Sequence, residues 1–254
     1  MTRFQSMILA TGLVLGLGRL ALAEDEQDVK AVIDKAVKAL GGAEKLGSAK
    51  IMSWKYKGKL HLDGNDNDFT TKVTAQGIDH FRQEFEGEFD GSTIKGVTVL
   101  DGDKAWRKVG DDSNKLEDTN LANEKRTTYL QIVPEMPLLL KGEDFKCEAG
   151  EEEKVGGKSA AVLKVTGPDA KDFQLYFDKE SGLPVRMTAT VADYQGDEYK
   201  QDWTFSNYKN FDGIKRATKV EIKRNDKKFV DFEVMDFKVV DKVDAKTFAE
   251  PKGD

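Results

Sequence analysis

The sequence of 254 residues is short of the side chains on which most enzyme chemistry depends, with one cysteine and two histidines. The single cysteine, Cys147, rules out an intrachain disulfide. On a strand pattern it is typical of a small core residue, and a reactive or intermolecular thiol is the alternative. His61 and His80 fall on the charged sides of separate strand patterns, and no Gly-x-Ser-x-Gly turn is present to hold a serine nucleophile. A hydrolase is therefore the least favoured class of function.

The sequence also lacks the motifs that hold a nucleotide or a metal ion. No glycine-rich phosphate loop precedes a predicted helix, and neither histidine has a second ligand at metal-binding spacing. Asp63, Asn65 and Asn67 match the start of a calcium loop, but the sixth position is Asp68 rather than glycine. We expect a solvated turn there, and no cofactor or metal in the protein.

No apolar run is long enough to span a bilayer, and the apolar N-terminus is typical of an export signal. Met7–Gly18 is apolar, and the small residues of Ala21–Ala23 suit signal peptidase. We predict cleavage after Ala23, which makes residues 1–23 the signal peptide and the mature protein periplasmic or extracellular. The alternative is a retained N-terminal anchor, which Arg19 disfavours because it interrupts the apolar run.

Acidic residues outnumber basic ones. The formal net charge is −6, and loss of Arg3 and Arg19 with the signal takes it to −8. An acidic surface with both signs evenly mixed disfavours nucleic acid as a partner, and it disfavours electrostatic docking on anionic lipid. We expect no nucleic-acid partner.

What the sequence does have is strand after strand with apolar residues on one face and charged residues on the other. His80–Phe89 is the clearest case, because Phe81, Phe85 and Phe89 share one face of the strand. Turn-like breaks such as Asp101–Asp103 join the strands, which predicts antiparallel neighbours and a mainly β fold. The predicted strands are Ile51–Leu62, Phe69–Ala75, His80–Phe89, Thr93–Leu100, Lys104–Val109, Phe145–Glu153, Ser159–Val165, Phe173–Asp178, Val185–Tyr194, Glu198–Tyr208, Arg216–Arg224 and Phe229–Val240.

Two segments are predicted to be helical. Asp25–Leu40 carries apolar residues at helical spacing and ends at a pair of glycines, so we expect it to lay an apolar stripe on the sheet. Leu116–Leu140 has no period of two. A helix capped by Asp118 or Thr119 is predicted to run to about Ile132, and Pro134 and Pro137 end it. This inserted segment is interpreted either as a lid across one face of the sheet or as a cover for a core edge. The apolar stripe of the first helix consists of Val29, Val32, Ile33, Ala36, Val37 and Leu40.

Short motifs appear in a characteristic order along this pattern. Phe81-Arg82 lies within a strand, and the turn of residues 101–106 reads Asp-Gly-Asp-Lys-Ala-Trp. Leu175–Pro184, Phe211–Ile214 and Phe248–Pro251 follow much later. In this order the chain resembles the LolA/LolB-like superfamily of periplasmic carriers that sort outer-membrane lipoproteins. The likeness covers most of the mature chain as a pattern, and the Asp-Gly-x-x-x-Trp turn is its best single element.

The resemblance implies one half-barrel domain over residues 24–254. It would be an unclosed antiparallel β-barrel of about eleven strands, with an N-terminal amphipathic helix and an inserted helical lid. Such a barrel encloses a hydrophobic cavity for acyl chains. The resemblance gives as candidate cavity walls, with ordinary core packing as the alternative role of each, Trp54, Phe81, Phe85, Trp106, Met136, Leu138, Leu139 and Leu140.

One departure from the family pattern concerns mechanism. The family's lipoprotein carriers have an Arg-Pro pair just before the strand predicted at His80–Phe89, and that arginine is tied to locking and releasing cargo. This chain has Gly77-Ile78-Asp79 there. The shape can therefore be shared without the lipoprotein hand-over mechanism.

The first functional hypothesis is an exported, non-enzymatic carrier or binder of lipid or acyl chains. Its expected partners are a lipid or an acylated protein, together with membrane-associated donor and acceptor proteins. The second hypothesis is a structural or protein-interaction module whose helices fill the sheet and leave no cavity.

Overall fold

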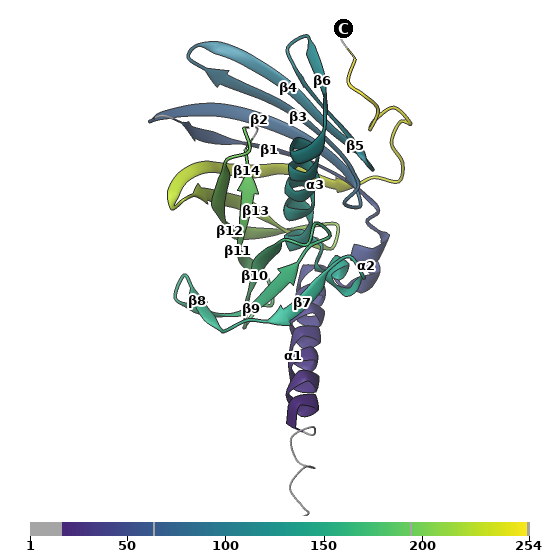
Figure 1. Cartoon of the computed structure of the whole chain (residues 1–254), viewed down its shortest axis with the longest axis vertical. Coiled ribbons are helices and arrows are strands. Elements are labelled where there is room, and N and C mark those ends of the chain that lie inside the picture. The colour runs from purple at the N-terminus through teal and green to yellow at the C-terminus, as the bar shows by residue number, and fades with distance from the viewer. Residues whose placement is uncertain (1–16, 63, 194, 253–254) are drawn as a thin grey trace, which may run out of the picture.

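The strands form a single curved sheet (Figure 1). Successive side chains along a strand point to opposite faces, so each strand presents alternate residues to the inner face of this sheet. The computed structural model describes residues 17–62, 64–193 and 195–252, with side chains from residue 26 onward. Within these ranges the sheet is antiparallel and its outermost strands do not pair with each other, so it is not closed. The strands are β1 Ile51–Leu62, β2 Asn65–Gln76, β3 His80–Phe89, β4 Ser92–Asp101, β5 Lys104–Val109, β6 Asp112–Leu116, β7 Lys146–Ala149, β8 Glu153–Val155, β9 Lys158–Thr166, β10 Asp172–Asp178, β11 Pro184–Ala192, β12 Glu198–Phe211, β13 Ile214–Arg224 and β14 Lys227–Val239.

The strand order shows that the first and last strands of the chain are neighbours in the middle of the sheet. It runs β6-β5-β4-β3-β2-β1-β14-β13-β12-β11-β10-β9-β7, with β8 paired to β9. The first strand therefore pairs with the last, and their register shifts between Lys55 and Tyr56. Gly58 on β1 lies so close to β14 that a Cβ added there would be 1.9 Å from the Asp231 carbonyl oxygen. This close pairing of β1 with β14 joins the β1–β6 half of the sheet to the β7–β14 half.

Helix α1 (Leu17–Leu40) packs the C-terminal part of its apolar stripe against β7, β13 and the 3₁₀ turn η2 (Pro137–Lys141). Ile33, Ala36, Val37 and Leu40 are buried there. Gly41 has a φ of 142° and ends the helix where a side chain would strike the β12–β13 turn. The short helix α2 (Ala43–Ser48) follows and leads into β1.

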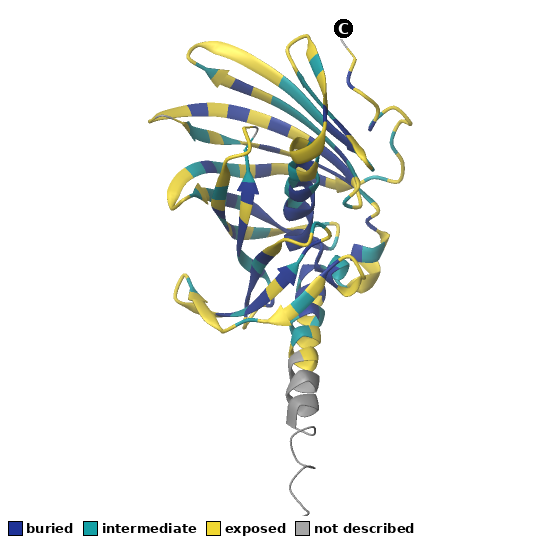
Figure 2. Cartoon of the chain, in the orientation of Figure 1, coloured by how far each residue is buried: buried dark blue, intermediate teal, exposed yellow. Residues whose placement is uncertain are grey.

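Helix α3 (Asp118–Ile132) and the 3₁₀ turn η1 (Val133–Glu135) form the inserted segment. The helix contacts both β5 and β11, which lie far apart in the sheet order, so α3 bridges the concave side of the sheet. Buried positions alternate along the strands and gather around α3 and the end of α1 (Figure 2). The core therefore lies between the sheet and these two helices.

Many predicted boundaries agree with the structure. β1, β3 and β5 begin and end at the predicted residues. The inserted helix, Asp118–Ile132, ends where expected, but Glu117 rather than Asp118 or Thr119 is its N-cap. Fourteen strands lie in the described ranges, where the resemblance implies about eleven. Phe145–Glu153 is divided into β7 and β8, and β6 forms from a polar stretch without alternation, as the second arm of a hairpin with β5.

The N-terminal region extends the predicted first helix. α1 begins at Leu17 rather than Asp25, so it runs through the predicted cleavage site after Ala23. Residues 1–16, which carry most of the predicted signal, lie outside the described residues. In the part of the chain that the structure describes, no helix has the length and apolar character needed to cross a bilayer.

Candidate functional site

The concave face holds a cavity of about 310 Å³. Strands β1, β2 and β3 supply one wall, β12, β13 and β14 supply the floor, and α3 with η1 covers the side toward the helices. The lining is mostly apolar and aromatic, as in small-molecule sites generally. The lining residues are Trp54, Tyr56, Leu60, Phe69, Thr71, Gln83, Phe85, Thr127, Leu130, Gln131, Glu135, Gln201, Trp203, Phe205, Arg216, Ala217, Val220, Ile222, Arg224, Phe229, Val230, Phe232 and Val234.

Aromatic rings form a continuous row across four strands of this surface. The centroid of Phe232 on β14 lies 4.4 Å from that of Tyr56 on β1, and Tyr56 lies 5.9 Å from Phe69 on β2. Phe69 stacks on Phe85 of β3 at 5.7 Å, and Phe85 contacts Phe89 at 6.2 Å. Since Phe89 is only half-buried, the row leads from the cavity toward the β3–β4 hairpin.

A buried ion pair stands at one end of the cavity. Arg216 on β13 faces Glu135 of η1, with 3.8 Å between Nε and Oε2, which is too long for a hydrogen bond. The guanidinium lies 4.6 Å from the ring centroids of both Trp54 and Phe237. Neither Arg216 Nε nor Glu135 Oε2 has a hydrogen-bond partner. Buried polar atoms are seldom left in this state, which marks this end of the cavity as unusual.

Burial dominates the electrostatics of this pair. It raises the pKa of Glu135, against the opposing influence of Arg216. It lowers the pKa of Arg216, which the Glu135 carboxylate and the Tyr208 hydroxyl partly offset. The amide N–H of Ala217 donates to Glu135 Oε1 at 3.3 Å, the one hydrogen bond that this carboxyl receives from the described residues.

The far end of β13 carries a second arginine. Arg224 stacks on Phe229, with 3.6 Å between the guanidinium carbon and the ring centroid. With the Gln201 amide oriented to suit its neighbours, its oxygen accepts from Arg224 Nε at 2.8 Å and from Nη2 at 3.2 Å. Arg224 is half-buried, and its guanidinium is thus already held by Gln201 and Phe229. Val220 and Ile222 line the cavity between the two arginines.

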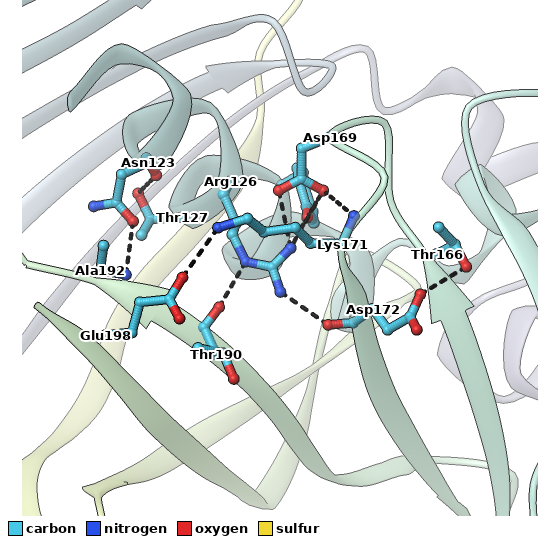
Figure 3. A network of polar contacts seen from close by, with 11 residues as sticks. Asn123, Arg126, Thr127, Thr166, Asp169, Lys171, Asp172, Thr190, Ala192 and Glu198 are labelled. Atoms are coloured by element: carbon cyan, nitrogen blue, oxygen red, sulfur yellow. Dashed lines mark hydrogen bonds and ion pairs between the residues drawn. The ribbon is translucent and has the colours of Figure 1, made fainter. Parts of the chain in front are cut away.

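Helix α3 is fixed to the sheet by a second network, shown in Figure 3. Arg126 Nη1 donates to Asp169 Oδ2 at 3.0 Å, its Nε to the Thr190 carbonyl at 2.7 Å, and its Nη2 to the Asp172 carbonyl at 2.9 Å. Tyr129 also donates to Asp169 Oδ1 at 2.8 Å. These contacts join α3 to the β9–β10 turn and to β11.

The opposite side of α3 is tied to β5 and to the turn before it. Arg107 Nη2 donates to Glu124 Oε2 at 3.0 Å, and the Glu124 side chain is 9% exposed. Lys125 Nζ donates to Asp103 Oδ1 at 2.5 Å. Because α3 is bound on both sides, the helix is a fixed wall of the cavity in this structure.

The predicted site residues on the strands occupy three kinds of position. Trp54 and Phe85 line the cavity. Phe81 is fully buried behind them and meets Trp54 edge-on, with 6.5 Å between ring centroids. Trp106 is half-buried on β5 opposite Val99 and is not part of the lining.

The predicted residues of the inserted segment lie in the core rather than on the cavity lining. Met136 and Leu140 are buried, and Leu138 and Leu139 pack partly buried against the same core cluster, where η2 meets α1 and α2. The same segment does reach the cavity through residues that the sequence interpretation passed over. They are Thr127, Leu130, Gln131 and Glu135.

The residues considered for polar chemistry lie away from the cavity lining. His61 stands between Asp66 and Asp231, at 2.6 Å from each, and His80 Nε2 is 3.2 Å from Asp101 Oδ1. In residues 17–62, 64–193 and 195–252, no group of three or more His, Cys, Asp or Glu side chains is arranged to hold a metal ion. Cys147 is a free thiol, partly buried at the edge of the core.

Comparison with solved structures gives the class of fold. The chain is structurally similar to a LolA superfamily protein from Nitrosomonas europaea, with a TM-score of 0.58 and 12% identity, over 87% of this chain and 97% of that chain. A DUF1329 family protein from Desulfovibrio piger gives a TM-score of 0.54 and 14% identity, over 87% and 96%. A domain classed with outer membrane lipoprotein-sorting proteins, from Vibrio parahaemolyticus, gives 0.50 and 12%, over 81% and 94%.

Sequence comparison adds no closer relative. No protein-family model matches the chain, and no curated protein sequence matches it. The chain therefore has a LolA-like fold, as the order of its motifs implied. At these identities the likeness establishes the fold alone, and the function is argued from the cavity.

Proposed function

We propose that this protein is an exported, non-enzymatic binder or carrier of acyl chains, with residues 24–254 as its half-barrel domain. The observation that carries the proposal is the apolar cavity on the concave face, with its row of aromatic rings leading outward. The alternative hypothesis, a β module whose helices fill the sheet, predicts no such cavity. The LolA-like fold supports the proposal as an analogy.

The size of the cavity bears on the ligand. Pockets for small molecules run from about 300 to 1,000 Å³, so a cavity of about 310 Å³ lies at the lower limit. That volume suits one acyl chain better than several. A single-chain lipid or one chain of an acylated protein is therefore the proposed cargo.

The energy of binding comes from removing the chain from water. Each buried methylene contributes about 0.8 kcal/mol, so ten methylenes contribute about 8 kcal/mol before the cost of immobilising the ligand. The walls need only apolar surface for this purpose. Strands β12, β13 and β14 provide it through residues such as Trp203, Val220 and Phe232.

The inserted segment serves in this proposal as a wall of the cavity. Leu130 closes it from α3, while Arg126 and Glu124 hold the helix in place. Met136 and Leu138–Leu140 would act by anchoring the segment to α1 and α2. Entry would then follow the aromatic row past Phe85 and Phe89. The proposed location is periplasmic or extracellular, with membrane-associated proteins as donor and acceptor.

A filling substitution tests the proposal. Val220→Trp places a large ring in the cavity and is expected to reduce uptake of a fluorescent fatty acid by at least about tenfold, since the lost space excludes chain methylenes. Lys223→Trp adds the same ring to the same strand at an exposed position and serves as the matched control. Equal uptake by both variants would contradict the cavity as the site. Folding of each variant is checked by circular dichroism.

A further inference from the structure

The charges on the cavity lining do not balance. Three of the lining residues are charged, namely Glu135, Arg216 and Arg224, which leaves one positive charge in excess. An apolar acyl chain does not need any of them. Charged groups at the boundary of an apolar cavity are costly to keep unless they are paired, so their presence requires a reason.

Among these three charged residues, Arg216 has the most hydrogen-bond donors without an acceptor. A guanidinium carries five N–H donors, yet Arg216 donates no hydrogen bond to any residue that the structure describes. It is 6% exposed, held between Trp54 and Phe237, and its one carboxylate neighbour is 3.8 Å away. The rings fix the plane of the guanidinium while leaving its edge without an acceptor.

We propose that Arg216 binds the anionic head group of an amphiphile, a carboxylate or a phosphodiester, whose acyl chain lies along β13 over Val220 and Ile222. The inference rests on the proposed function and names the chemical class of its ligand. Arginine binds carboxylate and phosphate through paired N–H groups, which supplies the acceptors that Arg216 lacks. One such anion can replace the Glu135 carboxylate as the counterion of Arg216.

The length of the site fits this arrangement. Arg216 and Arg224 are eight residues apart on β13, and eight residues of extended strand span roughly 26 Å. The surface between them is apolar. Arg224 is already engaged by Gln201 and Phe229, so the head group belongs at Arg216 and the chain extends toward Arg224.

Glu135 has a defined part in the proposal. Without ligand it is the counterion of Arg216, and a bound anion takes over that role. The groups that face Glu135 are Arg216 and Tyr208 from the neighbouring strands, and the amide of Ala217. Burial raises the pKa of Glu135, so this carboxyl accepts a proton when the anion takes its place, and head-group binding tightens as the pH falls for as long as the head group itself stays ionised.

The test uses the purified protein, stripped of lipid over a hydrophobic resin, and measures displacement of a fluorescent fatty acid. The probes are palmitate, a palmitoyl lysophosphatidylglycerol and 1-hexadecanol, with inorganic phosphate as an anion without a chain. Palmitate or the lysophospholipid should bind at least about tenfold more tightly than hexadecanol, since a hydrogen bond to a charged group contributes that much. Whichever anion binds more tightly identifies the source of the head group.

Two variants separate the head group from the fold. Arg216→Met alone leaves the Glu135 carboxylate buried without a counterion, so the double variant Glu135→Gln/Arg216→Met is used. It should lose the preference for anionic probes while it keeps its affinity for hexadecanol. Glu135→Gln alone should bind palmitate more tightly than the parent protein. The matched control is Arg82→Met/Glu84→Gln, which removes an Arg–Glu pair away from the cavity lining. It should change neither the preference for anionic probes nor the affinity for hexadecanol.

The outcomes distinguish this inference from the proposed function. If the parent protein binds hexadecanol as tightly as both anionic probes, or if the double variant keeps the preference for an anion, Arg216 is not the head-group site and the acyl-chain site remains. If the parent protein binds none of the three long-chain probes, both this inference and the proposed function fail. Binding of inorganic phosphate alone, at the affinity of the lipids, would also overturn the inference.

Discussion

Arg126 of α3 and Asp169 of the β9–β10 turn form an ion pair in which Nη1 and Oδ2 are 3.0 Å apart and only 3% of the arginine side chain is exposed. Two strand carbonyls accept from Nε and Nη2 of the guanidinium. The pair thus ties the inserted helix to a turn more than forty residues further along the chain. It explains how a helix without a strong apolar stripe keeps a fixed position inside the sheet.

Removing this arginine should therefore be costly. Arg126→Met leaves Asp169 without its partner and two strand carbonyls without donors, so we expect a loss of about 3–5 kcal/mol in the free energy of unfolding. Lys171→Met breaks an exposed pair with Glu198 beside the same network and should cost less than about 1 kcal/mol. Urea denaturation measures both. Similar values for the two variants would show that Arg126 does not anchor α3.

Gly58 gives a prediction about the join between the two halves of the sheet. A Cβ at this position would lie 1.9 Å from the Asp231 carbonyl oxygen and 2.6 Å from the Phe232 Cα, which are backbone atoms that cannot turn aside. Gly58→Ala should destabilise the protein by about 1–3 kcal/mol. The control is Gly96→Ala on β4, where the nearest backbone atom is 3.4 Å away. Equal thermal stability of both variants would contradict the close pairing of β1 with β14.

Cys147 should be a poor nucleophile in the folded protein. Burial raises the pKa of its thiol to about 11. At pH 8 the thiolate fraction then falls from about a quarter to about a thousandth, so reaction with Ellman's reagent should be on the order of a hundredfold slower than in urea. A native rate equal to the denatured rate would favour the alternative of a reactive thiol.

The ionisation of Glu135 should appear in the pH dependence of stability. Because burial raises the pKa of this carboxyl in the folded state, the folded protein keeps the proton over a range in which the unfolded chain has lost it. Stability therefore declines as the pH rises through that range. Glu135→Gln removes the ionisation, so the stability of the variant relative to the parent should improve as the pH rises above the ordinary pKa of a glutamate, about 4.3.

Urea midpoints at several pH values measure this difference. Glu124 on α3 also has a pKa raised by burial, but it is present in both proteins and cancels from the comparison. A difference that stays constant across the range would mean that Glu135 ionises alike in the folded and unfolded states.

The strands were predictable because their alternation is a local property. His80–Phe89 carries its own register in the order of its residues, and the structure places that strand at the same boundaries. β6 was missed because Asp112–Leu116 has no alternation and forms only against β5. Local pattern thus identified most elements and failed where pairing alone decides the structure.

The cavity was less predictable, because its charged end is assembled from distant segments. Glu135 meets β13 through Ala217, which is 82 residues further along the chain. One signal was present in the sequence, since Arg216 falls in phase with Val220 and Ile222 on the apolar face of its strand. A charged residue at such a position marks either an error in the pattern or a functional group, and here it lines the cavity.

Native mass spectrometry of the protein, purified gently from its own export compartment and followed by organic extraction, tests the central claim most directly. The account predicts one bound molecule per chain in the mass range of a fatty acid or a single-chain lipid, lost on denaturation and recovered in the extract with an acidic head group. A protein that carries no such mass, and that also fails to take up a fluorescent fatty acid, would contradict it. The likeness to LolA proteins would then be one of shape alone.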